Sequence, residues 1–188
     1  MSASFPPEQH PPVVFTIGHS TRPIEEFIGL LHAHGVTRLI DVRTVPKSRH
    51  NPQFGEDRLP GELQAAGIAY ERMEGLGGFR RTSEASPNKG WRNASFRGYA
   101  DYMQTPAFAD ELQQLMAAAS RDQVAIMCAE AVPWRCHRSL VADALLVHGT
   151  GAEEIVSATR RQPHRLTPFA KVEGERITYP PEAPGGNG

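Results

Sequence analysis

Two apolar runs separated by a helical pattern, with no hairpin turn, constrain the fold of this chain more than any other feature. Residues 13–17 are short, mostly apolar and β-branched, as in a buried strand, and a glycine follows them. Residues 24–31 then carry apolar side chains at helical spacing, and residues 37–42 form a second apolar run. Because only a helix separates the two strands, they must run parallel, and the chain contains a βαβ unit.

The alternation of strands and helices continues to residue 157. We expect further helices over residues 59–66, 96–103, 107–119 and 139–148, and further strands from residue 68, over 124–128 and over 154–157. The prediction is a three-layer, Rossmann-like α/β sandwich with a mainly parallel five-stranded sheet. One domain should span residues 13–172. Residues 1–12 and 173–188 are rich in Pro and Gly and are expected to be loosely ordered tails.

Charge and cysteine content exclude several classes of protein. The formal net charge of −1 over 188 residues argues against bulk attraction to nucleic acid or to a membrane. No apolar run approaches the roughly 20 residues of a transmembrane helix, so no membrane partner is expected. Two cysteines do not form a disulfide framework in a chain of this length, which favours a reducing compartment. We therefore expect a cytoplasmic protein.

The stretch from Gln123 to Gly149 concentrates the reactive side chains of the chain. We interpret it as a strand, a polar loop and a helix that ends at Gly149. Both cysteines, Cys128 and Cys136, lie in this loop with a carboxylate, a histidine and two arginines. Free backbone N–H groups at a helix start attract anions and lower the pKa of a nearby thiol, and cationic neighbours do the same. This loop is where we expect an active site.

The predicted fold gathers polar residues from distant parts of the chain at one edge of the sheet. Sheets of this kind bind ligands outside the carboxyl ends of their strands. The residues that follow the first, second and fourth predicted strands should therefore meet there. They are His19, Ser20, Asp41, Arg43, Ser48, Cys128 and Glu130.

Several motifs of the chain resemble those of one known family. They are Gly18-His19-Ser20, Asp41-Val42-Arg43 with Pro46 and Ser48, Leu76-Gly77-Gly78, and Cys128-x-Glu130-x-x-Pro133-x-x-Cys136-His137-Arg138. Together they are similar to the signatures of the bacterial family called domain of unknown function 488, over about residues 13–157. The resemblance implies a fold and the location of a site, but no reaction.

The residues of this edge support two interpretations. Cys136 is followed by His137 and Arg138 near a helix start, which makes it a candidate thiolate nucleophile; the alternative is a buried, inert thiol. A carboxylate here can act as a general acid or base, or it can pair with an arginine inside the protein. The candidate catalytic residues are Cys136, Glu130, Asp41, Cys128 and His19, and the candidate substrate-binding residues are Ser20, Arg43, Ser48, His137 and Arg138.

Cofactor and metal signatures are missing from the sequence. Walker A and G-x-G-x-x-G motifs do not occur, so no cofactor is expected. The separation of Cys128 and Cys136 is longer than a zinc knuckle allows, so both thiols should be reduced and free of metal. A tyrosine-phosphatase loop needs an arginine where Trp134 stands, and Arg135 comes one position too late.

The leading hypothesis is an enzyme that acts on a small anionic substrate, phosphorylated or nucleotide-like. Arg43, Arg138 and the helix start would hold the anion, and Cys136 or the Glu130 and Asp41 pair would carry out the chemistry. The alternative is a noncatalytic module that binds nucleotides or nucleic acid. It rests on a basic loop over residues 79–97 with interleaved aromatic residues, and nucleic acid is the less favoured partner.

Overall fold

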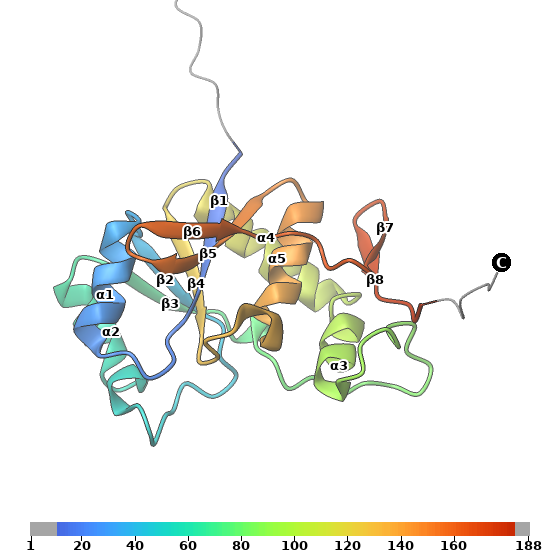
Figure 1. The fold of residues 1–188 in the computed structure, drawn as a ribbon, viewed down its shortest axis with the longest axis horizontal. Helices are drawn as coiled ribbons and strands as arrows, with labels where there is room; N and C mark the ends of the chain where they lie inside the picture. The colour runs from blue at the N-terminus through green and yellow to red at the C-terminus, as the bar shows by residue number, and fades with distance from the viewer. Residues whose placement is uncertain (1–10, 183–188) are drawn as a thin grey trace, which may run out of the picture.

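The structure, a computed structural model, describes residues 11–182 and centres on a six-stranded sheet (Figure 1). The strand order is β3-β2-β4-β1-β5-β6, and the first five strands are parallel. The strands are β1 Val13–Gly18, β2 Arg38–Asp41, β3 Ala69–Arg72, β4 Val124–Cys128, β5 Gly151–Ser157 and β6 Arg160–Pro163. The α/β class and the mainly parallel sheet are therefore confirmed.

The number of strands was predicted wrongly, because the sheet has six strands and not five. The sixth strand, β6, pairs antiparallel with β5 at the edge of the sheet. Its residues, Arg-Arg-Gln-Pro, are all exposed, so the strand has no apolar pattern. Charged residues and proline are typical of edge strands, whose outer backbone groups face solvent. Such a strand carries little signal in a sequence.

Helices cover both faces of the sheet. Because side chains alternate along a strand, Met127 of β4 faces one group of helices and Cys128 faces the other. The first group is α1 Ile24–Ala33 and α2 Leu59–Ala65; the second is α3 Ala94–Tyr102, α4 Pro106–Ala119 and α5 Arg138–Val147. Short 3-10 turns occur at η1 Pro52–Phe54, η2 Glu74–Leu76 and η3 Pro133–Arg135. The two groups lie on opposite sides of the strands in Figure 1.

Part of the segment expected to be a C-terminal tail is packed against the rest of the protein. The strands β7 Lys171–Glu173 and β8 Arg176–Thr178 form an antiparallel hairpin. Ile177 and Tyr179 are buried, and the Tyr179 hydroxyl donates to Asp143 Oδ2 at 2.8 Å. Ile177 and Tyr179 are thus part of the larger core cluster. The predicted tails at residues 1–10 and 183–188 lie outside the described residues.

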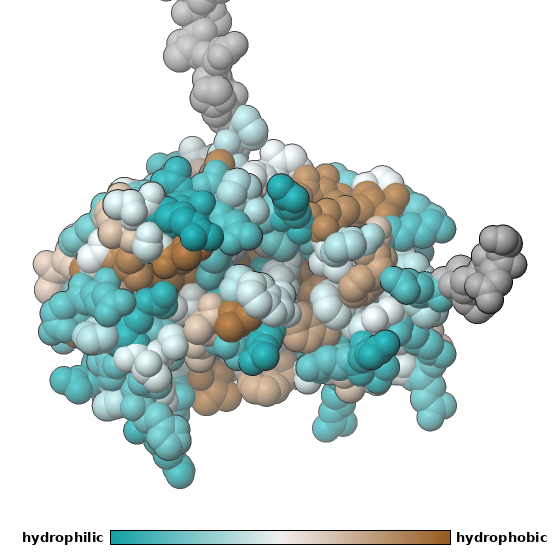
Figure 2. All heavy atoms as spheres, viewed as in Figure 1, coloured by the Kyte–Doolittle hydropathy of each residue, from teal (hydrophilic) through white to brown (hydrophobic). Residues whose placement is uncertain are grey.

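The register of the parallel strands brings the expected residues to one edge. Gly18 at the end of β1 lies beside Cys128, and Asp41 at the end of β2 lies beside Met127. Strand β4 lies between β1 and β2, an order that the sequence did not predict. On the face seen in Figure 2, apolar patches are set within a mainly hydrophilic surface. No helix in the described part of the chain is long and apolar enough to cross a membrane.

Candidate functional site

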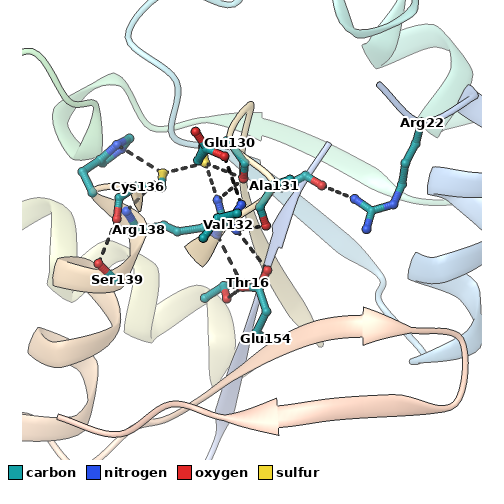
Figure 3. Close-up of polar contacts among 12 residues, drawn as sticks. Thr16, Arg22, Glu130, Ala131, Val132, Cys136, Arg138, Ser139 and Glu154 are labelled. Atoms are coloured by element: carbon teal, nitrogen blue, oxygen red, sulfur yellow. Dashed lines mark hydrogen bonds and ion pairs between the residues drawn. The ribbon is translucent and has the colours of Figure 1, made fainter. Parts of the chain in front are cut away.

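The two cysteines are in contact at the carboxyl end of β4. Cys128 is the last residue of that strand, and Cys136 lies between η3 and the start of α5. Their sulfur atoms are 2.6 Å apart, both side chains are buried, and both thiols are free (Figure 3). The backbone N–H of Arg138, the first residue of α5, donates to Cys136 Sγ at 3.5 Å. The predicted placement of a thiol at a helix start is therefore observed.

Arg138 is fully buried and uses its guanidinium inside the protein. It donates to Cys128 Sγ at 2.7 Å, to the backbone oxygens of Glu130 and Ala131, and to the Glu154 carboxylate at 3.0 Å. Figure 3 shows this fork between the loop and β5. The geometry supports the alternative in which an arginine of this loop pairs with a carboxylate inside the protein. The carboxylate that pairs with Arg138 is Glu154, on β5. Glu154 was not among the predicted site residues, because it starts a predicted strand far from the loop.

His137 is oriented as a base for Cys136. Its Nε2 lies 3.0 Å from the backbone oxygen of Val42, which can only accept, so Nε2 carries the proton. Nδ1 faces Cys136 Sγ at 3.6 Å, where it can take the proton of the thiol and then donate a hydrogen bond to the thiolate. A nucleophile, a neighbouring base and a group that orients the base are the elements of an activated thiol. The predicted binding residue His137 therefore lies where it can exchange a proton with the thiol.

The two thiols differ in acidity. The pKa of Cys136 is lowered to about 4, because the Cys128 thiol donates a hydrogen bond to the Cys136 thiolate and outweighs the opposing effect of burial. The hydrogen bond with His137 and the positive charges of His137 and Arg138 lower it further. The pKa of the Cys128 thiol is raised well above its usual value by burial and by Cys136. At neutral pH the pair therefore holds one proton and one negative charge.

A cavity of about 510 Å³ is lined in part by both cysteines. Arg43 and His137 lie on its wall, and the exposed Arg135 is on its rim. Phe79, also on the wall, is 81% exposed and has a positive φ of 56°, which is unusual for a residue other than glycine. A Cβ at its neighbour Gly78 would lie 3.1 Å from His137 Nδ1, so a larger residue there would require the His137 ring to move by a few tenths of an ångström. The remaining lining residues are Thr44, Val45, Asn93, Ser95, Phe96, Ala129 and Glu130.

Asp41 and Arg43 form a buried pair at the end of β2. The Asp41 carboxylate accepts from Arg43 Nε at 2.9 Å and Nη2 at 2.6 Å, and also from the Tyr70 hydroxyl at 2.8 Å. Burial, followed by the charge of Asp41, raises the pKa of Tyr70, so this hydroxyl keeps its proton. Asp41 therefore fixes the orientation of Arg43 and is fully occupied. This is the structural pairing that the sequence left open for a carboxylate at a strand end.

His19 is neutral and lies behind Arg43. Its Nδ1 donates to the backbone oxygen of Ser20 at 2.8 Å, so Nε2 faces Arg43 Nη1 at 3.4 Å as an acceptor. The ring stacks on Phe54 at 4.2 Å between centroids. Burial lowers the pKa of His19 to about 4, and the positive charge of Arg43 contributes to the shift. His19 therefore positions Arg43 and does not itself line the cavity at the cysteines.

The remaining predicted residues line a second cavity of about 410 Å³ on the other side of the β4–η3 loop. Ser20, Ser48 and Glu130 all border it. Ser20 has a positive φ of 51°, and Ser48 Oγ accepts from the backbone N–H of Asn51 at 2.9 Å. Glu130 borders both cavities, and its exposed carboxylate accepts from the backbone N–H of Val132 at 3.1 Å. Of the predicted acids and bases, Glu130 is the one exposed to solvent.

The basic loop at residues 79–97 uses several of its side chains inside the protein. Trp91 packs on Phe96 and Phe169, with ring centroids 4.8 Å apart in each pair. Arg80 lies over the Tyr102 ring at 3.8 Å and donates to the backbone oxygen of Gly77. The aromatic residues of this loop are Phe79, Trp91 and Phe96, and of these only Phe79 is largely exposed. A row of exposed aromatic residues, as used to stack single-stranded nucleic acid, is not formed by this loop.

Most of the segments that form this sheet edge lie in a stretch that matches a known family. A family model described as Domain of unknown function DUF488 matches residues 23–145, about two thirds of the chain. The chain belongs to the DUF488 family. Comparisons with curated proteins and with solved structures give no significant match.

The DUF488 match covers part of the site. The stretch that matches the family contains the Asp41–Arg43 pair, both cysteines and the start of α5. His19 and Ser20 precede it, and Glu154 follows it. The buried ion pair between Arg138 and Glu154 thus joins the matched stretch to strand β5 outside it. Among residues 11–182, no group of three or more His, Cys, Asp or Glu side chains is arranged to hold a metal ion.

Proposed function

We propose that this DUF488 protein is an enzyme in which the Cys136 thiolate attacks a small anionic substrate bound at the carboxyl edge of the sheet. The observation that carries the proposal is the contact of two thiols at the start of α5, on the wall of a cavity that also contains Arg43 and His137. A thiolate, not a thiol, is the nucleophile in cysteine chemistry. The helix start, the Cys128 thiol and His137 all favour the thiolate at Cys136.

The cavity favours an anionic substrate because its polar wall and rim carry positive charge. Asp41 accepts from Nε and Nη2 of Arg43, so the remaining N–H groups of the guanidinium are already oriented before a ligand binds. Arg135 on the rim adds a second cation. The exposed Phe79 ring at the same cavity offers an apolar surface, which suits a phosphorylated or nucleotide-like molecule with a flat group. Glu130 is the residue we assign to proton transfer with the leaving group.

The proposal also includes a layer arrangement for the fold and a cellular location. A Rossmann-like, three-layer arrangement accounts for a ligand site outside the carboxyl ends of β1, β2 and β4. A cytoplasmic location accounts for free thiols in a protein of this size. The runner-up function is a noncatalytic module for nucleotides or nucleic acid, in which the same cavity binds an anion and Cys136 stays unreactive.

A pair of alkylating reagents of similar size tests the proposal. The reduced protein is treated with anionic iodoacetate or neutral iodoacetamide, and mass spectrometry of peptides locates the modified thiol. We expect Cys136 to react before Cys128. The rate with iodoacetate divided by the rate with iodoacetamide should be higher for the folded protein than for the urea-denatured chain. Inorganic phosphate should slow the reaction in the folded protein by occupying the cavity.

Two arginine variants show whether the rate ratio depends on a charge at the cavity or on the net charge of the protein. Arg135→Gln should lower the rate ratio several-fold, because Arg135 lines the cavity. Arg121→Gln removes the same charge before the start of β4, at the opposite end of that strand, and should leave the ratio unchanged. An unreactive Cys136 in a protein that still binds phosphate would support the noncatalytic alternative instead.

A further inference from the structure

In the function proposed above the Cys128 thiol only stabilises the Cys136 thiolate and forms no bond itself, although its sulfur is in contact with the nucleophile. Its Sγ is 2.6 Å from Cys136 Sγ, and both side chains border the same cavity. A disulfide bond is about 2.05 Å long, so a bond between them requires an approach of roughly half an ångström. Two free thiols held this close differ from a single buried cysteine, because each is the nearest nucleophile to any adduct on the other.

We propose that Cys128 is the resolving thiol of a two-cysteine exchange reaction, and that the substrate is a small disulfide that carries an anionic group. The inference rests on the proposed function, because Cys136 makes the first attack. It also assigns the substrate class, since a resolving thiol is needed when the adduct on the first cysteine is itself a disulfide.

The exchange proceeds in two balanced steps. In the first, the Cys136 thiolate attacks one sulfur of the substrate RS–SR′, forms a mixed disulfide Cys136–S–S–R, and releases R′S⁻. In the second, Cys128 attacks the Cys136 sulfur, the S–S bond to R breaks, and the Cys128 proton leaves with RS⁻ as RSH. The protein loses two hydrogens overall and the substrate is reduced to two thiols. Turnover is completed by an external dithiol, which is oxidised as it restores both cysteines.

The surroundings of Cys128 suit this second step. Its sulfur accepts a hydrogen bond from Arg138 Nη1 at 2.7 Å, and a guanidinium at that distance stabilises the thiolate as it forms. Arg138 is in turn fixed by Glu154 and by two backbone oxygens of the loop. Before the first attack the negative charge is on Cys136, so Cys128 stays protonated. Once Cys136 is bonded to R, that charge is gone, and Cys128 is the thiol beside the cation.

The test uses dithiodiglycolate, a small disulfide with a carboxylate at each end. The reduced protein is mixed with one equivalent and its intact mass is measured over time. We expect a transient adduct, followed by a protein that has lost two hydrogens and retains no adduct. Neutral bis(2-hydroxyethyl) disulfide should react roughly tenfold more slowly, as the loss of one charge-assisted hydrogen bond predicts.

Cys128→Ser provides the decisive variant, because serine keeps an acceptor for Arg138. This variant should form the adduct at Cys136 and retain it. A wild-type protein that also retains the adduct would overturn the role of Cys128, and equal rates with the two disulfides would overturn the anionic substrate class. If iodoacetate alkylates Cys136 but neither disulfide reacts, the proposed function stands and this inference fails. If Cys136 reacts with none of these reagents, both fail.

Discussion

Arg138 is the residue that holds the site together. One guanidinium contacts the sulfur of Cys128, two backbone oxygens of the β4–η3 loop and the Glu154 carboxylate. It is fully buried, while the Glu154 side chain is 14% exposed. A buried arginine in these surroundings costs much free energy unless every partner is present. Arg138 therefore holds the loop and β5 in place. We propose that Arg43 and Arg135, and not Arg138, bind the anion.

Replacement of Arg138 by Ala should lower stability much more than it lowers the affinity of the folded protein for an anion. The change leaves the Glu154 carboxylate without its cation, and loss of one partner of a buried pair costs about 3–5 kcal/mol. Urea unfolding measures this loss, and phosphate binding by the folded variant measures the affinity. Combining Arg138→Met with Glu154→Gln should recover part of the loss.

The matched control for Arg138→Ala is an arginine of a surface ion pair. Arg161 pairs with Glu153 at 2.6 Å, on the same β5–β6 hairpin, but its side chain is 40% exposed. Exposed pairs contribute about 0–1 kcal/mol, so Arg161→Ala should have little effect on stability. An Arg138→Ala variant no less stable than Arg161→Ala would mean that the buried contacts of Arg138 do not support the loop.

The element that brings the two cysteines together is the junction between β1 and the loop after β4. The backbone N–H groups of His19 and Ser20 donate to the oxygens of Cys128 and Ala129 at 2.9 and 3.1 Å. These bonds continue the pairing of β1 and β4 beyond the strands. Gly18 allows the loop to cross β1, because a Cβ there would lie 1.9 Å from the Glu130 oxygen.

A methyl group at Gly18 should displace the loop that contains Glu130. Gly18→Ala puts that methyl against backbone atoms, and such overpacking costs about 1–3 kcal/mol. It should also slow alkylation of Cys136, because the loop supports both sulfur atoms. Gly29→Ala is the control, since its Cβ meets no atom within 4 Å and the site lies inside α1.

Alanine in that helix should instead stabilise the protein by about 0.5–1 kcal/mol. Thermal unfolding and the rate of alkylation are compared for the two variants. An unchanged melting temperature and an unchanged rate in Gly18→Ala would show that the close crossing is not needed.

Strands and helices with an apolar pattern were predictable at the element scale, and polar edge strands were not. The parallel order of β1, β2 and β4 followed from the helices between them. Strand β6 is exposed at all four residues, and β7 is exposed at all three. Their pairing partners are determined by the folded sheet and hairpin, so local sequence patterns did not indicate them.

At the scale of the whole molecule, the site is assembled from segments that are far apart in the chain. His137 is oriented by Val42 at the end of β2, and Arg138 reaches Glu154 on β5. Arg43 is held by Asp41, whose carboxylate also accepts from the Tyr70 hydroxyl of β3. The sequence predicted which residues reach the edge, because the carboxyl ends of parallel strands meet there. It did not predict which donor serves which acceptor, because those pairs depend on side-chain directions across four strands.

The pH dependence of Cys136 alkylation tests the central claim, that the fold makes this thiol a thiolate. The rate with iodoacetamide follows the thiolate fraction, so a lower pKa moves the fall in rate to a lower pH. In the folded protein the rate should persist below neutrality and fall only as the pH approaches about 4. In the urea-denatured chain it should fall below a pKa of about 8.5, the value for free cysteine. A folded-state profile that coincides with the denatured one would contradict the account.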